Sequence, residues 1–327
     1  MTRGNLPTID VHAHALLPVW ISALAKATGQ TAGSVKFADA PLPDWSVEGH
    51  LRIMNEHAIG ASVLSLPGAT SFLRGDDAKV LARAMNEQFA EIIREHPHRF
   101  SAFAVVPMDD VEAALEETAY ALDVLKLDGV SSDASSDGKY LGHAYYDPWL
   151  EELNRRRTTL FVHPSVPPRF EMTDVGLNVS ILEFMFESTR MVANMVISGA
   201  KERFSKINII STHGGGTIPY LAARIGLLEP LFGRRALTDA EIQSGLSSFY
   251  YDLTASTSAP SLAALKKFIS PARLLMGFDF PMMPTTTIAP AQDQLAANGD
   301  FDDEATRAIL FGNAQKLFPR LREVSGH

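Results

Sequence analysis

The chain has 327 residues, of which 46% are hydrophobic and 20% are charged, the composition of a globular protein with a sizeable core. Its net charge is −9 and it contains no Lys/Arg-rich run, which argues against nucleic acid and anionic membranes as partners. Cysteine is absent, which excludes disulfides, thiolate nucleophiles and Cys-ligated metals. Because we find neither an apolar leader nor a membrane-length apolar stretch, we expect a cytoplasmic protein.

Short β-rich runs alternate with amphipathic helical stretches along the whole chain. The expected strands are, in order, 8–13, 61–66, 100–107, 127–132, 159–164, 207–213, 248–254 and 274–279. Most of these runs are continuously apolar, as is typical of strands that helices cover on their outer side. Between them, stretches such as 80–96 and 181–198 carry an apolar stripe at helical spacing.

Eight strand–helix units predict an α/β fold, a (β/α)8 TIM barrel, in which residues 1–327 form a single domain. No Gly-rich dinucleotide fingerprint follows the first strand, which disfavours an open Rossmann sheet. Residues 15–45, with their polar stretch, are expected to form an inserted lid loop over the carboxyl-terminal face of the barrel. Residues 169–178 are a candidate for a second such loop.

Four of the expected strands end in a residue that can bind a metal ion. His12 and His14 close the first strand and share one face of it, because side chains alternate along a strand. His163 closes the fifth strand, His213 the sixth and Asp279 the eighth. Since the carboxyl ends of all barrel strands meet at one mouth, these groups are expected to converge on a divalent cation.

Taken singly, each of these residues also has an ordinary structural interpretation. His163 precedes a proline and can bond a loop, and His213 precedes three glycines and can line a turn. Asp279 can cap a turn, and an isolated His-x-His pair is a weak signal. Their joint occurrence at four strand ends favours the metal site.

The order of these residues resembles the signature of the amidohydrolase superfamily. The resemblance is to the branch of aminocarboxymuconate-semialdehyde decarboxylase and the metal-dependent benzoate decarboxylases. It rests on DVHAHALLP, FVHP, the stretch from Glu187 through STHGGGTIPYLAARI, and MGFDFPM. Two further stretches, GDDAKVLARAMNEQFAEIIREHPHRFSAFAVVPMDD and DPWLEELNRRRTTLFVHP, are most similar to the 6-methylsalicylate decarboxylase-like members.

The resemblance implies roles for individual residues. The implied metal ligands are His12, His14, His163 and Asp279, and His213 matches the catalytic histidine of the branch. Arg224 matches an arginine that reaches the substrate carboxylate from the neighbouring subunit, which implies a homodimer. An ordinary surface arginine is the alternative interpretation of this residue.

One departure from the branch concerns the substrate. The semialdehyde decarboxylases carry a second carboxylate-binding arginine at a place that falls near Ala38, but no arginine lies between Gly4 and Arg52. A small aromatic monocarboxylate with an ortho hydroxyl therefore fits better than a dicarboxylate. Its ring could lie under aromatic side chains of the predicted loops, namely Trp20, Phe37, Trp45 and Phe170.

The expected reaction is non-oxidative decarboxylation that releases CO2, with Asp279 or His213 as the proton donor and no organic cofactor. The ligand set suits Zn²⁺ best, with Mn²⁺ as the alternative. A metal-dependent hydrolase of an ester, lactone or amide would use the same constellation and remains open. A non-catalytic barrel would be expected to lack one or more of these residues, and none is missing.

Overall fold

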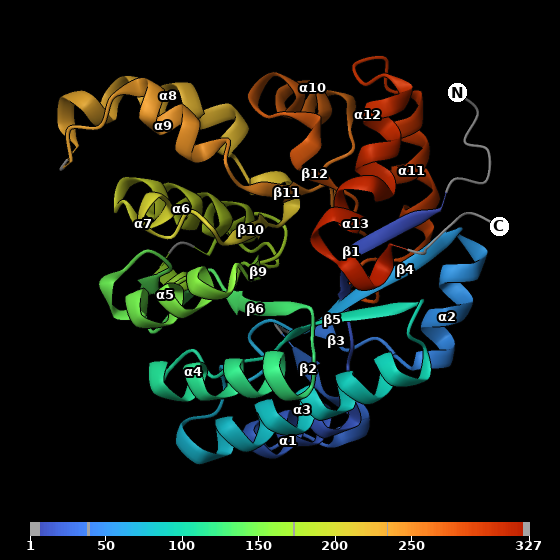
Figure 1. The fold of residues 1–327 in the computed structure, drawn as a ribbon. Coiled ribbons are helices and arrows are strands. Elements are labelled where there is room, and N and C mark those ends of the chain that lie inside the picture. The colour runs from blue at the N-terminus through green and yellow to red at the C-terminus, as the bar shows by residue number, and fades with distance from the viewer. Residues whose placement is uncertain (1–6, 38–39, 173, 234, 323–327) are drawn as a thin grey trace.

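The molecule is built around a ring of eight parallel strands that follow one another in chain order (Figure 1). The computed structural model describes residues 7–37, 40–172, 174–233 and 235–322, without the side chains of Ala32 and Phe37. The ring strands are β1 (Thr8–His14), β4 (Ile59–Ser65), β5 (Phe100–Ala104), β6 (Gly129–Asp133), β9 (Thr159–His163), β10 (Asn208–Ser211), β11 (Tyr250–Asp252) and β12 (Leu274–Leu275).

Hydrogen bonds beyond the last strand close the ring. Val11 N donates to Met276 O at 2.9 Å, and His14 N donates to Phe280 O at 2.7 Å. These bonds join the segment that follows β12 to β1, the first strand. The predicted (β/α)8 barrel is therefore confirmed, and all eight predicted strands are present.

Helices surround the ring, most of them between successive strands and the last three after β12 (Figure 1). They are α1 (Pro18–Thr28), α2 (Val47–Glu56), α3 (Gly75–Glu95), α4 (Val111–Ala119), α5 (Asp147–Arg156), α6 (Glu183–Ile197), α7 (Ala200–Arg203), α8 (Ile218–Phe232), α9 (Asp239–Leu246), α10 (Ala259–Phe268), α11 (Ile288–Ala297), α12 (Asp303–Arg307) and α13 (Asn313–Leu317). Helix α3 illustrates why these helices pack on the ring. Its predicted apolar stripe buries Met85, Phe89 and Ile93 against the barrel.

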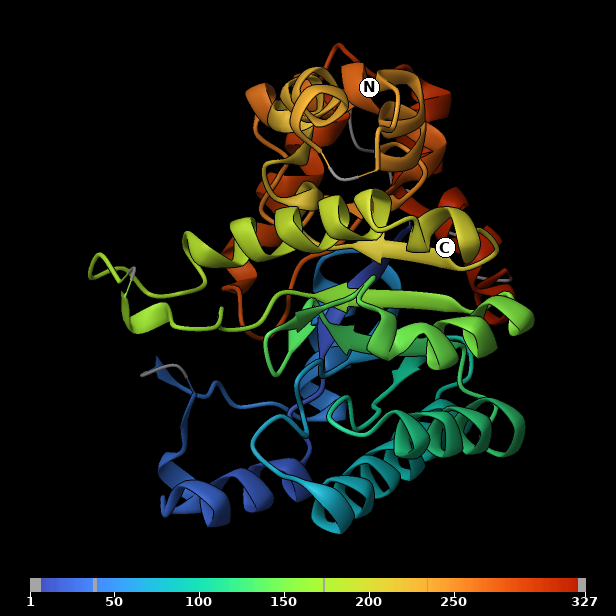
Figure 2. The same cartoon turned by 90° about the vertical axis from the view of Figure 1, so that its left-hand side faces the viewer.

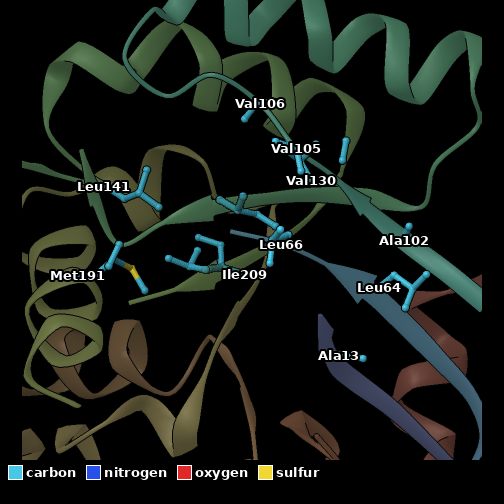
Figure 3. Packing of buried hydrophobic residues seen from close by; sticks show 14 of the residues in the cluster. Ala13, Leu64, Leu66, Ala102, Val105, Val106, Val130, Leu141, Met191 and Ile209 are labelled. Carbon is cyan, nitrogen blue, oxygen red and sulfur yellow. The ribbon is translucent and has the colours of Figure 1, made fainter. Parts of the chain in front are cut away.

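The apolar core has two layers. The larger layer lies between strands and helices, where Figure 3 shows Met191 of α6 and Leu141 close to Ile209 of β10. The second layer fills the barrel interior, and α13 with the residues after it closes the amino-terminal end. Phe318 packs there against Phe103 with ring centroids 5.5 Å apart. With one end of the barrel filled, polar groups have room at the carboxyl-terminal end.

Two excursions project from the same side of the molecule. Figure 2 shows them as the blue segment that follows α1 and the yellow-green segment that precedes α6. The segment predicted as a lid, 15–45, contains α1 and a small hairpin, β2 (Lys36–Phe37) with β3 (Ala40–Pro41), rather than loop alone. A second hairpin joins β7 (Ser135–Ser136) to β8 (Lys139–Tyr140). Among the described residues, we find no helix with the length and apolar character to cross a bilayer.

A buried histidine anchors α2 to the outside of the barrel. The ring of His50 accepts a hydrogen bond from Trp45 Nε1 at 3.2 Å, and its Nε2 lies 3.2 Å from Ser62 Oγ on β4. The ring also contacts Phe280 at a centroid distance of 4.9 Å. Burial, aided by the positive charge of Arg99, lowers the pKa of His50 to about 3.

The low pKa of His50 predicts acid-sensitive stability. In the unfolded chain this side chain gains a proton as pH falls below about 6.5, whereas the folded protein excludes that proton until about pH 3. Stability contributed by neutral His50 is therefore full above pH 6.5 and is lost progressively toward pH 3. We expect His50→Gln to flatten the pH dependence of the unfolding free energy by up to about 1.4 kcal/mol per pH unit in this window.

The measurement is urea unfolding of both proteins between pH 4 and 8. His98→Gln, a change at an exposed histidine, is the matched control and should leave the slope unchanged. An unaltered slope in His50→Gln would contradict the assignment.

Candidate metal centre

A β-bulge in β1 brings both histidines of this strand to the inside of the barrel. The pairing of β1 with β4 shifts register between Asp10 and Ala13. Val11 belongs to the interior cluster, yet the adjacent His12 also faces inward, since its ring contacts Phe161 at 5.0 Å. A bulge places two consecutive residues on one face in this way.

Four of the predicted residues converge at the carboxyl ends of their strands. His12 Nε2 lies 3.2 Å from His14 Nε2, and His14 Nε2 lies 2.9 Å from Asp279 Oδ1. With His163, these side chains each offer one ligand atom, and the four atoms lie within 4.8 Å of one another. That spacing fits one metal ion bound by three imidazoles and a carboxylate. The predicted ligand set is thus brought together.

Hydrogen bonds fix the orientation of His14. Its Nδ1 lies 3.2 Å from Ser65 Oγ, and that hydroxyl donates its proton to Ala13 O. Because the hydroxyl proton is already used, Ser65 accepts a bond from Nδ1–H of His14. The lone pair of His14 is therefore on Nε2, toward the cluster.

The rings of His12 and His163 are also held at Nδ1 by a hydrogen-bond acceptor. His163 Nδ1 donates to Pro164 O at 2.7 Å, and His12 Nδ1 lies 3.0 Å from Asp252 Oδ2. A carbonyl and a carboxylate can only accept, so both rings carry their proton on Nδ1 and a lone pair on Nε2. Such outer partners are typical of metal-binding histidines.

The protonation states also suit a cation site. Burial lowers the pKa of His12 and of His163, which favours the neutral form of the imidazole that can act as a ligand. Burial alone would raise the pKa of Asp279, but the neighbouring imidazoles of His12 and His14 hold it well below its usual range. Asp279 Oδ1 is buried 2.9 Å from His14 Nε2, but that nitrogen carries a lone pair, so no hydrogen bond from the described residues satisfies the oxygen. A carboxylate oxygen in this state is suited to coordinate a cation.

His213 lies beside the cluster, on a turn that follows β10. Its Nε2 is 3.9 Å from Asp279 Oδ2, and its Nδ1 is buried without a hydrogen-bond partner among the described residues. Both His213 and Asp279 have left-handed backbones, with φ of 55° and 58°. The glycines after His213 are needed for close approach, since a Cβ at Gly216 would lie 2.0 Å from Met185 O. Strained backbone of this kind concentrates at functional sites.

Neither Arg224 nor Trp45 belongs to this cluster. Arg224 is exposed on α8, and the structure gives it no hydrogen bond or ion pair within the described ranges. Trp45 is partly buried and donates its indole N–H to His50. The side chain of Phe37 lies outside the described residues. The predicted substrate contacts of these three residues stay predictions.

Sequence reasoning missed Asp252, the residue that faces the ring of His12. This aspartate ends β11 in the run YYDLT, so it occupies the same kind of strand end as the predicted ligands. Its position at a strand end was the signal in the sequence that could have identified it as a site residue. Burial would raise the pKa of Asp252, but the interactions with His12, with His213 and with the backbone N–H of Thr254 together outweigh burial and lower it, so the group is a carboxylate.

Comparisons with known proteins match this geometry. The family described as "Amidohydrolase" matches residues 9–320. Decarboxylase macB of Penicillium terrestre is 34% identical over 333 residues, which cover 96% of this chain and 95% of the relative. The 6-methylsalicylic acid decarboxylase of Penicillium expansum is 31% identical and covers 97% of both chains.

A solved structure shares the fold. It is the dihydroxybenzoic acid decarboxylase from Polaromonas sp. JS666, described with bound manganese and the inhibitor 2-nitroresorcinol. It superposes with a TM-score of 0.77 at 21% identity and covers 96% of this chain and 97% of its own. The two relatives, which are named as decarboxylases, agree with the predicted branch. The chain belongs to the amidohydrolase family.

Proposed function

We propose that this chain is a metal-dependent, non-oxidative decarboxylase of a small aromatic acid of the 6-methylsalicylate type. The observation that carries the proposal is the set of three inward Nε2 lone pairs beside one carboxylate, at the mouth of the barrel. Full-length similarity to proteins named 6-methylsalicylic acid decarboxylase supports the reaction class. Those names favour a carboxy-lyase over the hydrolase that the same ligand set would permit.

The metal in this proposal is Zn²⁺, with Mn²⁺ as the alternative. A site of three imidazoles and one carboxylate favours Zn²⁺ on ligand chemistry, because nitrogen ligands predominate. The manganese of the Polaromonas structure supports the alternative. When bound, the cation would hold the substrate oxygens and stabilise the negative charge that develops during the reaction.

His213 is the proposed proton carrier. Decarboxylation of an aromatic acid places a proton on the ring carbon that bears the carboxylate, after which the carbon–carbon bond breaks and CO2 leaves. His213 is buried beside Asp279 and keeps one ring nitrogen free of partners among the described residues, so it can hold that proton over a bound ring. Asp279 is committed to the ligand set, which leaves it the second choice as donor.

Arg224 is the proposed substrate contact from a second subunit. It lies on one exposed face of α8 with Tyr220, Leu227 and Leu231, which are 86%, 68% and 68% exposed. A contiguous apolar stripe around a cation without a partner in the described chain supports a homodimer interface. Arg224 lies six residues, about 9 Å of helix, beyond the first residue of α8, and its side chain is exposed, so that a second subunit can pack against it.

The proposed substrate is a soluble aromatic carboxylate, and the proposed location of the enzyme is the cytoplasm. Phe37 and Trp45 are the proposed contacts of the substrate ring. Both residues lie on the excursion 15–45, which projects from the same side as the segment before α6 (Figure 2). Because the indole N–H of Trp45 is already donated, only its ring face is available to a substrate.

Product analysis on a panel of acids tests the reaction. We expect CO2 and the matching phenol from salicylate, 6-methylsalicylate or 2,6-dihydroxybenzoate. Benzoate and 3-hydroxybenzoate are the matched controls and should react at least about 100-fold more slowly, because they lack the ortho oxygen that a polar site recognises. Turnover of aryl esters without CO2 from any hydroxybenzoate would favour the hydrolase and refute this proposal.

Two histidine variants separate metal binding from chemistry. His163→Ala removes a ligand and should lose both bound metal and activity. His213→Ala should keep the metal and lower turnover by about 10²- to 10⁴-fold, the usual contribution of a proton-transfer group. Elemental analysis and initial rates on the same samples provide the measurement, and activity in metal-free His163→Ala protein would exclude the assigned role.

Subunit mixing tests donation by Arg224. Inactive Arg224→Ala and inactive His213→Ala proteins are combined, and subunit exchange is verified. A random dimer mixture should recover about a quarter of wild-type activity, since half the dimers then hold one intact site of two. Arg307→Ala, a change at an exposed arginine of α12, is the control and should behave as wild type. No recovery after exchange would rule out donation between subunits.

A further inference from the structure

Asp252 contacts two of the predicted site residues, His12 and His213. It is fully buried at the end of β11. Its Oδ2 lies 3.0 Å from Nδ1 of His12, a predicted ligand 240 residues away in sequence. Its Oδ1 accepts the backbone N–H groups of His213 and Thr254, each at 3.0 Å.

The first contact decides which nitrogen of His12 can bind a metal. A carboxylate offers no proton, so the short approach of Oδ2 requires a proton on Nδ1 and leaves the lone pair on Nε2. Thr254 Oγ1 lies 3.1 Å from the same nitrogen. A hydroxyl can donate or accept, however, so Thr254 alone would not fix the tautomer. Asp252 is therefore the group that does.

The second contact fixes the backbone of His213. This residue has a φ of 55°, which an L side chain rarely adopts unless its surroundings hold it there. The hydrogen bond from His213 N to Asp252 Oδ1 is such a constraint. One planar group thus ties the ring of His12 to the backbone of His213.

We propose that Asp252 is a positioning residue that sets the metal-binding tautomer of His12 before any metal arrives and fixes His213 beside it. The part concerning His12 stands on the ligand cluster alone. The part concerning His213 rests on the proposed function, in which this histidine carries the proton.

A purely structural carboxylate that caps the turn 252–254 is the competing interpretation, and Asp252→Asn separates the two. The asparagine retains an oxygen that can accept from His213 N and Thr254 N, so the turn stays capped. Its NH2 group, however, replaces Oδ2 and presents a donor to His12. His12 must then expose a lone pair on Nδ1 and carry its proton on Nε2, where it opposes the cation.

The matched control is Asp10→Asn. Asp10 is also a fully buried aspartate, and its Oδ1 accepts from His12 N at 3.0 Å and from Phe278 N at 3.1 Å. It contacts the backbone of His12 but not the ring. The same chemical change at this position should therefore leave the tautomer of His12 and the metal affinity unaltered.

The experiment uses the full chain in two measurements. Nitrogen NMR of metal-stripped, ¹⁵N-histidine-labelled protein reports the tautomer of His12, whose signals are assigned by their loss in His12→Gln. We expect the proton on Nδ1 in the wild type and in Asp10→Asn, and on Nε2 in Asp252→Asn. Competition with a zinc chelator should show a loss of Zn²⁺ affinity of about 10- to 100-fold in Asp252→Asn only, the usual effect of removing an outer partner.

The tautomer of His12 in the metal-stripped wild type tests the proposal even if Asp252→Asn does not fold. A proton on Nε2 of His12 in the metal-stripped wild type overturns the proposal. So does an Asp252→Asn protein that matches Asp10→Asn in both tautomer and Zn²⁺ affinity. Failure of the proposed decarboxylase function would show in the substrate panel of the loaded wild type and would leave these two measurements unaffected.

Discussion

The orientation of three imidazole rings is the constraint on which the rest of this structure depends. Each ring is held at Nδ1 by an acceptor, so each Nε2 is left with a lone pair that faces the same point. The acceptors differ in kind: Asp252 offers a carboxylate, Ser65 a hydroxyl and Pro164 a backbone carbonyl. They act alike because none has a proton to give to the ring. Without them, each ring could present either nitrogen, and the affinity of the cluster for a cation would be lower.

The packing of the barrel decides which of its two ends holds the polar groups of the centre. Phe318 and its neighbours pack into the amino-terminal end, where Phe103 and the interior cluster exclude water. At the opposite end the strands stop early, since β10 and β12 end before His213 and Asp279. These two residues then lie on turns with left-handed backbones, which aim side chains that a regular strand would direct elsewhere.

The candidate ligands and the outer segments belong to different parts of the fold. The ligands come from the strand ends, whereas the excursions after α1 and before α6 and the exposed face of α8 lie outside the ring (Figure 2). In barrel proteins, segments outside the ring can vary in sequence without moving the residues at the strand ends. The relatives named 6-methylsalicylic acid decarboxylase match this chain over nearly its whole length, outer segments included. This is why the similarity carries information on the reaction class.

The sequence by itself determined the eight strands, the barrel and the four candidate ligands, because periodicity and residue type at strand ends are local properties. His12, His14, His163 and Asp279 are all visible in this way. Only the tertiary structure decided that Val11 and His12 face the same side, since that follows from a bulge in the pairing with β4. It alone also paired Asp252 with His12 across 240 residues, because hydrogen-bond partners are set by the closure of the ring and not by spacing along the chain.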